Sequence, residues 1–194
     1  MGRTRLEAFS DAVIAIIITI MVLDLRPPES TSLSALIPIL PVFFSYILSF
    51  IYIGIYWNNH HHLLHLCPKV NGSILWANLH LLFWLSLFPF VTGWLGENHF
   101  AALPGLLYGM VLLAAALAYW LLQSRIIAFQ GPRSPLAAAV RRNWKEKISP
   151  LLYLLGIAAA ALGHPWPALP AYVLVALLWL VPDRRIERAV RAAE

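Results

Sequence analysis

Long apolar runs alternate with short polar connections along the whole chain. A helix needs about 20 mostly apolar residues to cross the hydrocarbon core of a bilayer. Six runs come close to that length or exceed it, and they cover residues 7–25, 34–58, 71–95, 101–124, 145–163 and 165–182. The pattern predicts an all-α membrane protein in which residues 1–194 form a single domain of six transmembrane helices.

Prolines mark where the predicted helices end or bend. Pro27 and Pro28 follow the first run and close it, whereas Pro89 lies inside the third run. Because a proline ring clashes with the preceding turn and lacks an amide donor, we expect a kink in the third helix at Pro89. The connection expected between the second and third helices, residues 60–71, holds most of the histidines.

Composition agrees with a membrane location, and the basic residues predict the orientation. Hydrophobic residues make up 60% of the chain and charged residues 12%, and the mean hydropathy is +0.72. With six spans, 13 of the 14 Lys and Arg residues lie on one side, and only Arg26 lies on the other. Basic residues concentrate on the cytoplasmic side, so we expect both termini in the cytoplasm and the protein in the cell (inner) membrane. The excess of basic residues then reflects topology, so we expect contact with anionic lipid headgroups and no binding of nucleic acid.

The sequence offers little for covalent or redox chemistry. Cys67 is the only cysteine, so no intrachain disulfide can form. The sequence contains no G-x-S-x-G or H-E-x-x-H motif and no phosphate-binding loop. We therefore expect a protein that is not an enzyme and that has no cofactor.

Asp11 is a carboxylate inside the first apolar run. Ionisable residues within membrane spans are costly and are functional by default. The side chain can reach water at the nearby interface, or it can pair with Arg5 or with the histidines that begin at His60, at the same membrane level. The sequence alone leaves both interpretations open.

Four histidines between Trp57 and His65 suggest a metal site. His61 and His65, like His62 and His65, are spaced so that each pair shares one face of a helix. The other histidines are scattered, unlike the several histidine boxes of membrane di-iron enzymes. We expect no functional metal and favour hydrogen bonding of His60 or His61 to the first helix.

The first helix carries one apolar stripe. At 100° per residue, Ile16, Ile20 and Leu23 lie within about 40° of one another, whereas Asp11 lies about 140° from Ile16. Such a stripe can face lipid, a neighbouring helix or a pore, and periodicity does not distinguish them. It predicts that Asp11 and the stripe face different surroundings.

Small residues four apart occur in the fourth and fifth runs. They are Gly105 with Gly109, and Gly156 with Ala160. This spacing lets helix backbones approach closely in a membrane. Packing within one subunit is favoured over contact between subunits.

Several short motifs, in this order along the chain, resemble those of a known family. They are Arg5-Leu6-Glu7-Ala8-Phe9-Ser10-Asp11, Ile53-Gly54-Ile55-Tyr56-Trp57, Asn59-His60-His61, Leu75-Trp76-Ala77-Asn78 and Phe88-Pro89-Phe90, followed by Thr92 and Leu95-Gly96-Glu97. The first is similar to the R-x-x-x-F-S-D signature of transmembrane protein 175, the lysosomal potassium channel, and its prokaryotic relatives. The chain resembles the prokaryotic form, which has one repeat and assembles as a tetramer.

The resemblance implies a homotetrameric, leak-type potassium channel whose pore is lined by the first helix of each subunit. K+ would be the permeant ion, and the partners would be other copies of this chain and membrane lipid. The sequence lacks the T-V-G-Y-G carbonyl filter. In this family rings of large apolar side chains form the constriction, and Ile16, Ile20 and Leu23 align with them. Thr19 aligns with a position implicated in potassium selectivity.

The resemblance also implies a structural polar network that sets the rotation of the first helix. Its members are Arg5, Phe9, Ser10, Asp11, Asn59, His60, His61, Trp76 and Asn78. By analogy, the polar members on the first helix bond with His60 or His61 and with the two members on the third helix.

Asp24 lies at the other end of the first helix. A ring of such carboxylates would enrich cations at the outer mouth of a pore, and the alternative is an interfacial carboxylate that simply faces water.

Two other functions remain as alternatives. One is a proton-coupled secondary transporter that uses Asp11 and the His60–His65 cluster, and the other is an enzyme or metal protein built on that cluster. Saturable uptake that responds to a pH gradient would identify the transporter, and metal analysis would identify the metal protein.

Overall fold

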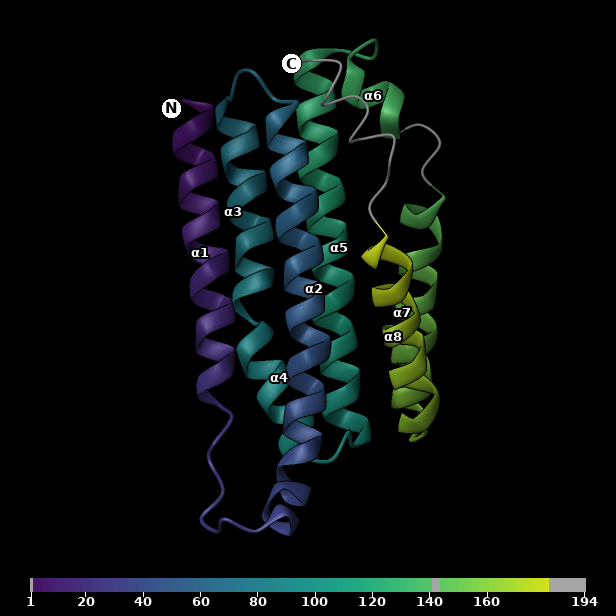
Figure 1. Cartoon of the computed structure of the whole chain (residues 1–194). Helices are drawn as coiled ribbons and strands as arrows, with labels where there is room; N and C mark the ends of the chain where they lie inside the picture. The colour runs from purple at the N-terminus through teal and green to yellow at the C-terminus, as the bar shows by residue number, and fades with distance from the viewer. Residues whose placement is uncertain (1, 141–143, 182–194) are drawn as a thin grey trace.

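The computed structural model describes residues 2–140 and 144–181, and every regular element within them is a helix (Figure 1). Part of the basic connection (residues 141–143), the basic C-terminal tail and the last residue of the sixth predicted span lie outside the described residues. The prediction of an all-helical chain with several apolar helices is confirmed for the part that the structure describes.

The first two spans form an antiparallel pair. Helix α1, Arg3–Leu23, runs from the N-terminal end of the bundle to the opposite end. The 3-10 helix η1, Leu33–Ile39, then leads into α2, Leu40–His65, which returns alongside α1 (Figure 1).

Helix α2 ends later than its hydropathy predicts. The sequence-based prediction ended this span at residue 58 and placed the histidines in a connection, but the helix continues to His65 and only residues 66–71 connect it to the next. The prediction was wrong because hydropathy reports the preferred solvent of side chains, whereas a helix ends where the backbone is interrupted. Asn and His side chains do not interrupt it, and the first proline after them is Pro68.

The third span is broken near its middle. Helix α3, Gly72–Ser86, and helix α4, Phe88–Glu97, are separated at Leu87, and Pro89 lies in the first turn of α4. The predicted kink at Pro89 is confirmed. Helix α3 starts at Asn71, whose side chain accepts a hydrogen bond from Ile74 N at 3.0 Å.

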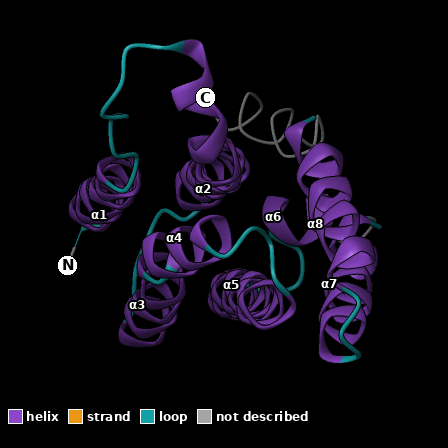
Figure 2. Cartoon of the chain, turned by 90° about the horizontal axis from the view of Figure 1, so that it is seen from below, coloured by secondary structure: helices purple, strands orange, loops and turns teal. Residues whose placement is uncertain are grey.

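The remaining helices complete the bundle on the side away from α1. Helix α5, Ala102–Gln130, contacts α3 and α4, and the short α6, Pro135–Val140, follows at the end where α1 begins. Helices α7, Lys145–Ala161, and α8, Pro165–Leu180, form a hairpin that packs on α5 and lies opposite α1 in both views (Figures 1 and 2).

Four helical stretches in the described residues are long and apolar enough to cross a membrane. They are Arg3–Leu23, Leu33–His65, Gly72–Glu97 and Ala102–Gln130. Helices α7 and α8 have 17 and 16 residues, fewer than the roughly 20 that a full crossing needs. The chain is therefore a multi-pass membrane protein in which α7 and α8 are each shorter than the four long stretches.

A buried tyrosine joins the α7–α8 hairpin to the rest of the bundle. The Tyr172 hydroxyl donates to Gly105 O at 3.1 Å, and the Tyr52 hydroxyl donates to Tyr172 O at 2.6 Å. A Cβ atom at Gly109 would overlap the Tyr172 hydroxyl, and one at Gly156 would lie 2.5 Å from the Tyr172 ring. The small residues thus make room for a ring within the subunit, the packing role that the sequence favoured.

Candidate functional site

Helix α1 has two unlike faces and lies at one edge of the bundle (Figure 2). One face packs against α2, α3 and α4. Its buried residues recur every three or four positions, as one helical face requires, and they are Leu6, Ser10, Ile14, Ile17 and Met21. This face anchors α1 to its own subunit.

The predicted apolar stripe lies on the other face. Ile16, Ile20 and Leu23 have exposed fractions of 56%, 45% and 77% in the single chain. Their neighbours Ile17 and Met21 are buried. The stripe is therefore an apolar surface that the subunit itself does not cover.

Thr19 lies beside the stripe and is also exposed. Its Oγ1 donates to Ile16 O at 2.9 Å, within the same helix. The hydroxyl proton is thus used locally, and the hydroxyl oxygen remains an acceptor.

A buried hydrogen-bonded chain links α1, α3 and α2. The Ser10 hydroxyl donates to Leu6 O at 2.9 Å, and Asn78 Nδ2 donates to Ser10 Oγ at 2.9 Å. Asn78 Oδ1 lies 2.7 Å from His60 Nε2. Since an amide oxygen only accepts, His60 Nε2 carries the hydrogen in this arrangement. Ser10, Asn78 and His60 are fully buried, so each bond replaces hydration that the groups have lost.

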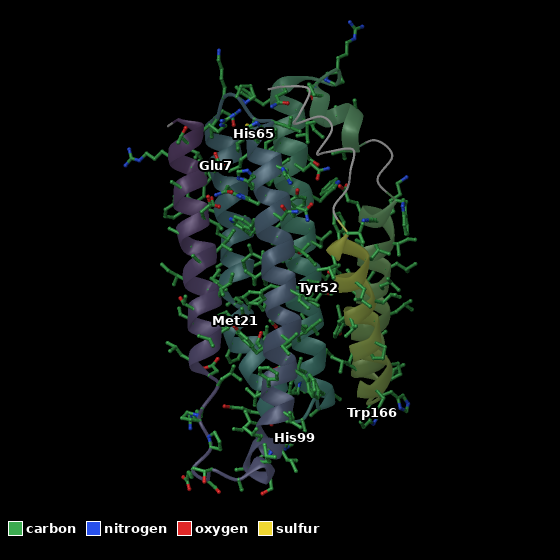
Figure 3. The ribbon with its side chains drawn as sticks, viewed as in Figure 1. Glu7, Met21, Tyr52, His65, His99 and Trp166 are labelled. Carbon is green, nitrogen blue, oxygen red and sulfur yellow. The ribbon has the colours of Figure 1, made fainter. Side chains whose placement is uncertain are left out.

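A second row of contacts runs along the α1–α2 boundary. Arg3 Nη1 donates to the backbone oxygen of His65 at 3.1 Å, the Glu7 carboxylate lies 3.0 Å from His61 Nδ1, and Trp57 Nε1 donates to Asp11 Oδ1 at 3.1 Å. Each step moves four residues forward on α1 and four back on α2, as antiparallel helices require. Figure 3 shows Glu7 and His65 near the same end of the bundle. The row sets the axial register of the two helices.

The structure thus divides the predicted polar network into two groups. Ser10, Asn78 and His60 form the buried chain, whereas Asp11 bonds to Trp57 and does not enter it. His61 pairs with Glu7 instead, near the surface. The prediction that Asp11 joins Asn78 and a histidine is therefore corrected within the subunit, because Asp11 and Ser10 are adjacent residues that point about 100° apart.

Within the described residues, the side chains of four predicted network members make no hydrogen bond to the buried chain. Asn59 Nδ2 donates to Ile55 O in its own helix. Phe9, Arg5 and Trp76 lie on the exposed surface of the subunit, Trp76 with 75% of its area exposed.

Sequence reasoning missed three side chains of the boundary row, Arg3, Glu7 and Trp57. The signal was present, because Glu7 and Asp11 are four residues apart, as are Trp57 and His61. The sequence does not contain the axial offset between α1 and α2 that places Glu7 and Asp11 opposite His61 and Trp57.

Asp24 lies against α4 at the opposite end of α1. An ideal Cβ at Gly93 would be 3.3 Å from Asp24 Oδ2, so the carboxylate approaches the α4 backbone closely at this glycine. Partial burial raises the pKa of Asp24 above its ordinary value, and the nearby Glu97 carboxylate adds to the shift, while Arg26 opposes it. Asp24 and Glu97 thus form a local acidic region at this end of the bundle.

The histidines do not combine into a metal site in the described part of the chain. No group of three His, Cys, Asp or Glu side chains there is arranged to hold a metal ion. Within those same residues, His60 Nδ1 has no hydrogen-bond partner.

Comparison with known proteins identifies the family. Residues 5–89, which include α1 from its third residue onward and all three members of the buried chain, match the model of the endosomal/lysosomal potassium channel TMEM175. The chain is 56% identical over 191 residues to a potassium channel of Chryseobacterium sp. (strain P1-3). The aligned region covers 98% of this chain and 99% of the relative. The chain belongs to the TMEM175 potassium channel family.

Two further similarities agree with this assignment. A potassium channel of Streptomyces collinus (strain DSM 40733 / Tue 365) is 32% identical over 189 residues, which is 90% of each chain. The crystal structure of a lysosomal potassium-selective channel TMEM175 homolog from Chamaesiphon minutus matches with a TM-score of 0.77 and 24% identity, over 93% of this chain and 97% of that chain. The chain therefore has the fold of that TMEM175 homologue, and the resemblance predicted from the sequence is confirmed.

Proposed function

We propose that this TMEM175 family member is a subunit of a homotetrameric, potassium-selective leak channel whose pore is lined by α1. The exposed stripe of Ile16, Ile20 and Leu23 carries the proposal, because it is a continuous apolar face at the edge of the subunit. Four such faces meeting on a shared axis would bury their stripes against one another and leave a narrow apolar passage between them. The potassium channel names of the relatives support K+ as the permeant ion.

We also propose that the chain crosses the membrane six times. Both termini then lie in the cytoplasm, and the channel lies in the cell (inner) membrane. Successive long segments run in alternating directions through the bundle, and α7 and α8 continue the alternation (Figure 1). At 1.5 Å per residue these two helices measure roughly 24–26 Å, slightly less than the hydrocarbon core. Interfacial side chains and local thinning of the bilayer accommodate a mismatch of this size.

The proposed barrier to ions is a hydrophobic constriction. When the isoleucine rings approach one another, water leaves the passage and an ion faces the cost of losing its hydration shell. A small widening allows water to return and ions to pass. Ile16 and Ile20 would form the narrow part, Thr19 Oγ1 would lie beside it as a potential ligand for K+, and Asp24 would attract cations at the outer mouth.

The buried chain and the boundary row have a structural role in this proposal. Ser10 bonds to α3 on the buried face, and Asp11 bonds to α2 at the boundary. Together these contacts oppose rotation of α1 about its own axis. They would therefore keep Ile16 directed toward the pore axis.

Adjacent isoleucines provide a matched test. Ile16 is exposed and Ile17 is buried, and each can be changed to alanine in protein reconstituted into liposomes. Potassium efflux through Ile16→Ala should rise on the order of tenfold, which corresponds to about 1.4 kcal/mol off the barrier. Ile17→Ala should instead lose about 2–4 kcal/mol of stability through the cavity it creates, with little change in flux per folded channel.

Several outcomes would contradict the proposal. No potassium flux in the wild type or in Ile16→Ala would exclude a channel. An equal rise in flux for both variants would place the pore elsewhere. Uptake that saturates and follows a pH gradient would favour the proton-coupled transporter, although Asp11 and His60 bond to different partners here.

A further inference from the structure

A cavity of about 640 Å³ lies at the end of the bundle where α1 begins. Three separate parts of the chain line it: the start of α1, the α2–α3 connection and the end of α5 with the start of α6. Figure 1 shows these parts at the same end of the molecule as the N-terminus. The pore proposal assigns no role to this cavity.

The charge of the cavity is positive. Its lining includes Arg3 and Lys69, and none of the described lining residues is Asp or Glu. Arg3 Nη1 donates to His65 O, which positions the guanidinium at the cavity. A guanidinium has five N–H donors, so Arg3 can hold the end of α2 and an anion together.

A neutral hydroxyl donor and a hydrogen bond between two walls of the cavity complete the site. The Ser134 hydroxyl oxygen accepts a hydrogen bond from Ala137 N, which leaves the hydroxyl hydrogen available to donate. Gln130 Nε2 donates to Leu66 O at 2.6 Å and so ties the end of α5 to the α2–α3 connection. The walls of the cavity are thus held in place by hydrogen bonds between its separate parts.

The rim has an apolar component. Phe129 lines the cavity and has 46% of its area exposed, and Pro68 and Pro135 also belong to the lining. Apolar side chains in the same lining as basic ones suit the membrane–water interface, where headgroups and the first methylene groups meet the protein. This combination suits a phosphate with an attached lipid better than it suits a small ion alone.

We propose that this cavity binds a phosphate-bearing anion, either the headgroup of an anionic phospholipid or a free phosphate. Arg3 and Lys69 neutralise the phosphate, and Ser134 donates a hydrogen bond to it. The bound anion connects the first residue of α1 to the α2–α3 connection and to the α5–α6 connection. Occupancy therefore stabilises the position of the helix that carries the apolar stripe.

Binding measurements on the full chain test the proposal without any need for ion conduction. Native mass spectrometry would measure the affinity for phosphatidylglycerol and for zwitterionic phosphatidylcholine, and calorimetry would measure the affinity for inorganic phosphate. The variants are Lys69→Gln, whose exposed side chain can be replaced without loss of packing, and the double variant Arg3→Gln/Lys69→Gln. The control is Arg125→Gln/Lys147→Gln, which removes the same charge at exposed residues outside the cavity lining.

We expect the wild type to bind phosphatidylglycerol more tightly than phosphatidylcholine. The affinity for phosphatidylglycerol should fall about tenfold in Lys69→Gln and further in the double variant, and it should be unchanged in the control. The same pattern seen only with inorganic phosphate would support the site and identify free phosphate as its ligand. The proposal would be overturned if the wild type, the double variant and the control all bound phosphatidylglycerol with the same affinity and all bound inorganic phosphate with the same affinity. So would a loss confined to the control.

Discussion

The inward face of α1 buries a hydrogen-bonded polar group among apolar residues, whereas its outward face exposes large apolar side chains. The inward face places the Ser10 hydroxyl in a fully buried chain with Asn78 and His60, whereas the outward face exposes Ile16 and Leu23. In water this arrangement would be unfavourable. In a bilayer it is favourable, since lipid accepts apolar side chains and polar groups must be satisfied within the protein.

Helix α1 has two tasks: its inward face positions the helix within the subunit, and its outward face contacts lipid or other copies of the chain. Hydrogen bonds are directional, so the inward face specifies how α1 is rotated and how far it is shifted along α2 and α3. Apolar contacts are not directional, so the outward face can adapt to lipid or to other copies of the chain. Changes on the inward face should therefore alter stability, and changes on the outward face should alter function.

The largest effect is expected from breaking the buried chain at its centre. Asn78→Leu keeps the approximate volume but leaves Ser10 Oγ without its donor and His60 Nε2 without its acceptor. Each unsatisfied buried group costs about 1–3 kcal/mol, so we expect a loss of roughly 2–4 kcal/mol in thermal unfolding of the purified protein in detergent.

An exposed asparagine is the control for this experiment. Asn98 Nδ2 bonds to Trp94 O in the adjacent turn, and the side chain of Asn98 is exposed. Asn98→Leu should change the stability by less than about 0.5 kcal/mol. Equal melting temperatures for the two variants would show that the inward face does not depend on its polar chain.

A medium effect is expected at the boundary between the two faces. Trp57→Phe keeps an aromatic ring but removes the donor to Asp11, whose side chain is half-buried. A double-mutant cycle with Asp11→Ala, which removes the acceptor, should give a coupling energy of about 0.5–1.5 kcal/mol in thermal unfolding. Trp120→Phe combined with Asp11→Ala provides the comparison, because Trp120 is an exposed tryptophan on α5. A coupling of the same size there would reject a specific role for Trp57.

The smallest effect is expected at Asp24. Because burial and Glu97 raise its pKa above 3.8, Asp24 takes up a proton at a higher pH than an ordinary aspartate as the outer solution is acidified. If its charge enriches cations, potassium flux at low ionic strength should fall by up to about twofold over that pH range, and Asp24→Asn should abolish the decline. The same raised pKa means that the carboxylate is less favourable in the folded state than in the unfolded state, so at neutral pH Asp24→Asn should not destabilise the protein.

Glu29 offers a control for the pH experiment. It is an exposed carboxylate in the connection that follows α1. Glu29→Gln should keep the pH dependence of the wild type. If Asp24→Asn also keeps it, Asp24 contributes nothing to cation entry.

Much of α1 could be predicted from the sequence because it follows from periodicity. A period of 3.6 residues placed Ile16, Ile20 and Leu23 on one face and Asp11 on another, and the structure shows the stripe exposed and Asp11 at the α2 boundary. The kink at Pro89 was also predictable, because a proline lacks an amide donor wherever it occurs. These properties depend on residues within one turn or one helix.

The histidines could not be assigned from the sequence. His60 and His61 are consecutive residues with almost the same neighbours in the chain, yet His60 is fully buried against Asn78 and His61 pairs with Glu7 near the surface. Which of them turns inward depends on the rotation of α2 against α1 and α3. That rotation is a property of packed helices and has no signature in a single run of residues.

The apolar spans, the break in the third one and the two faces of α1 follow from the amino-acid sequence alone, since each depends on local geometry and on the preference of side chains for lipid. The partners depend on how the helices pack: Trp57 for Asp11, Asn78 for Ser10 and His60, and Tyr172 for Gly109. A hydrogen bond between helices requires a particular axial offset and rotation. Those quantities are set by the packing of the whole bundle.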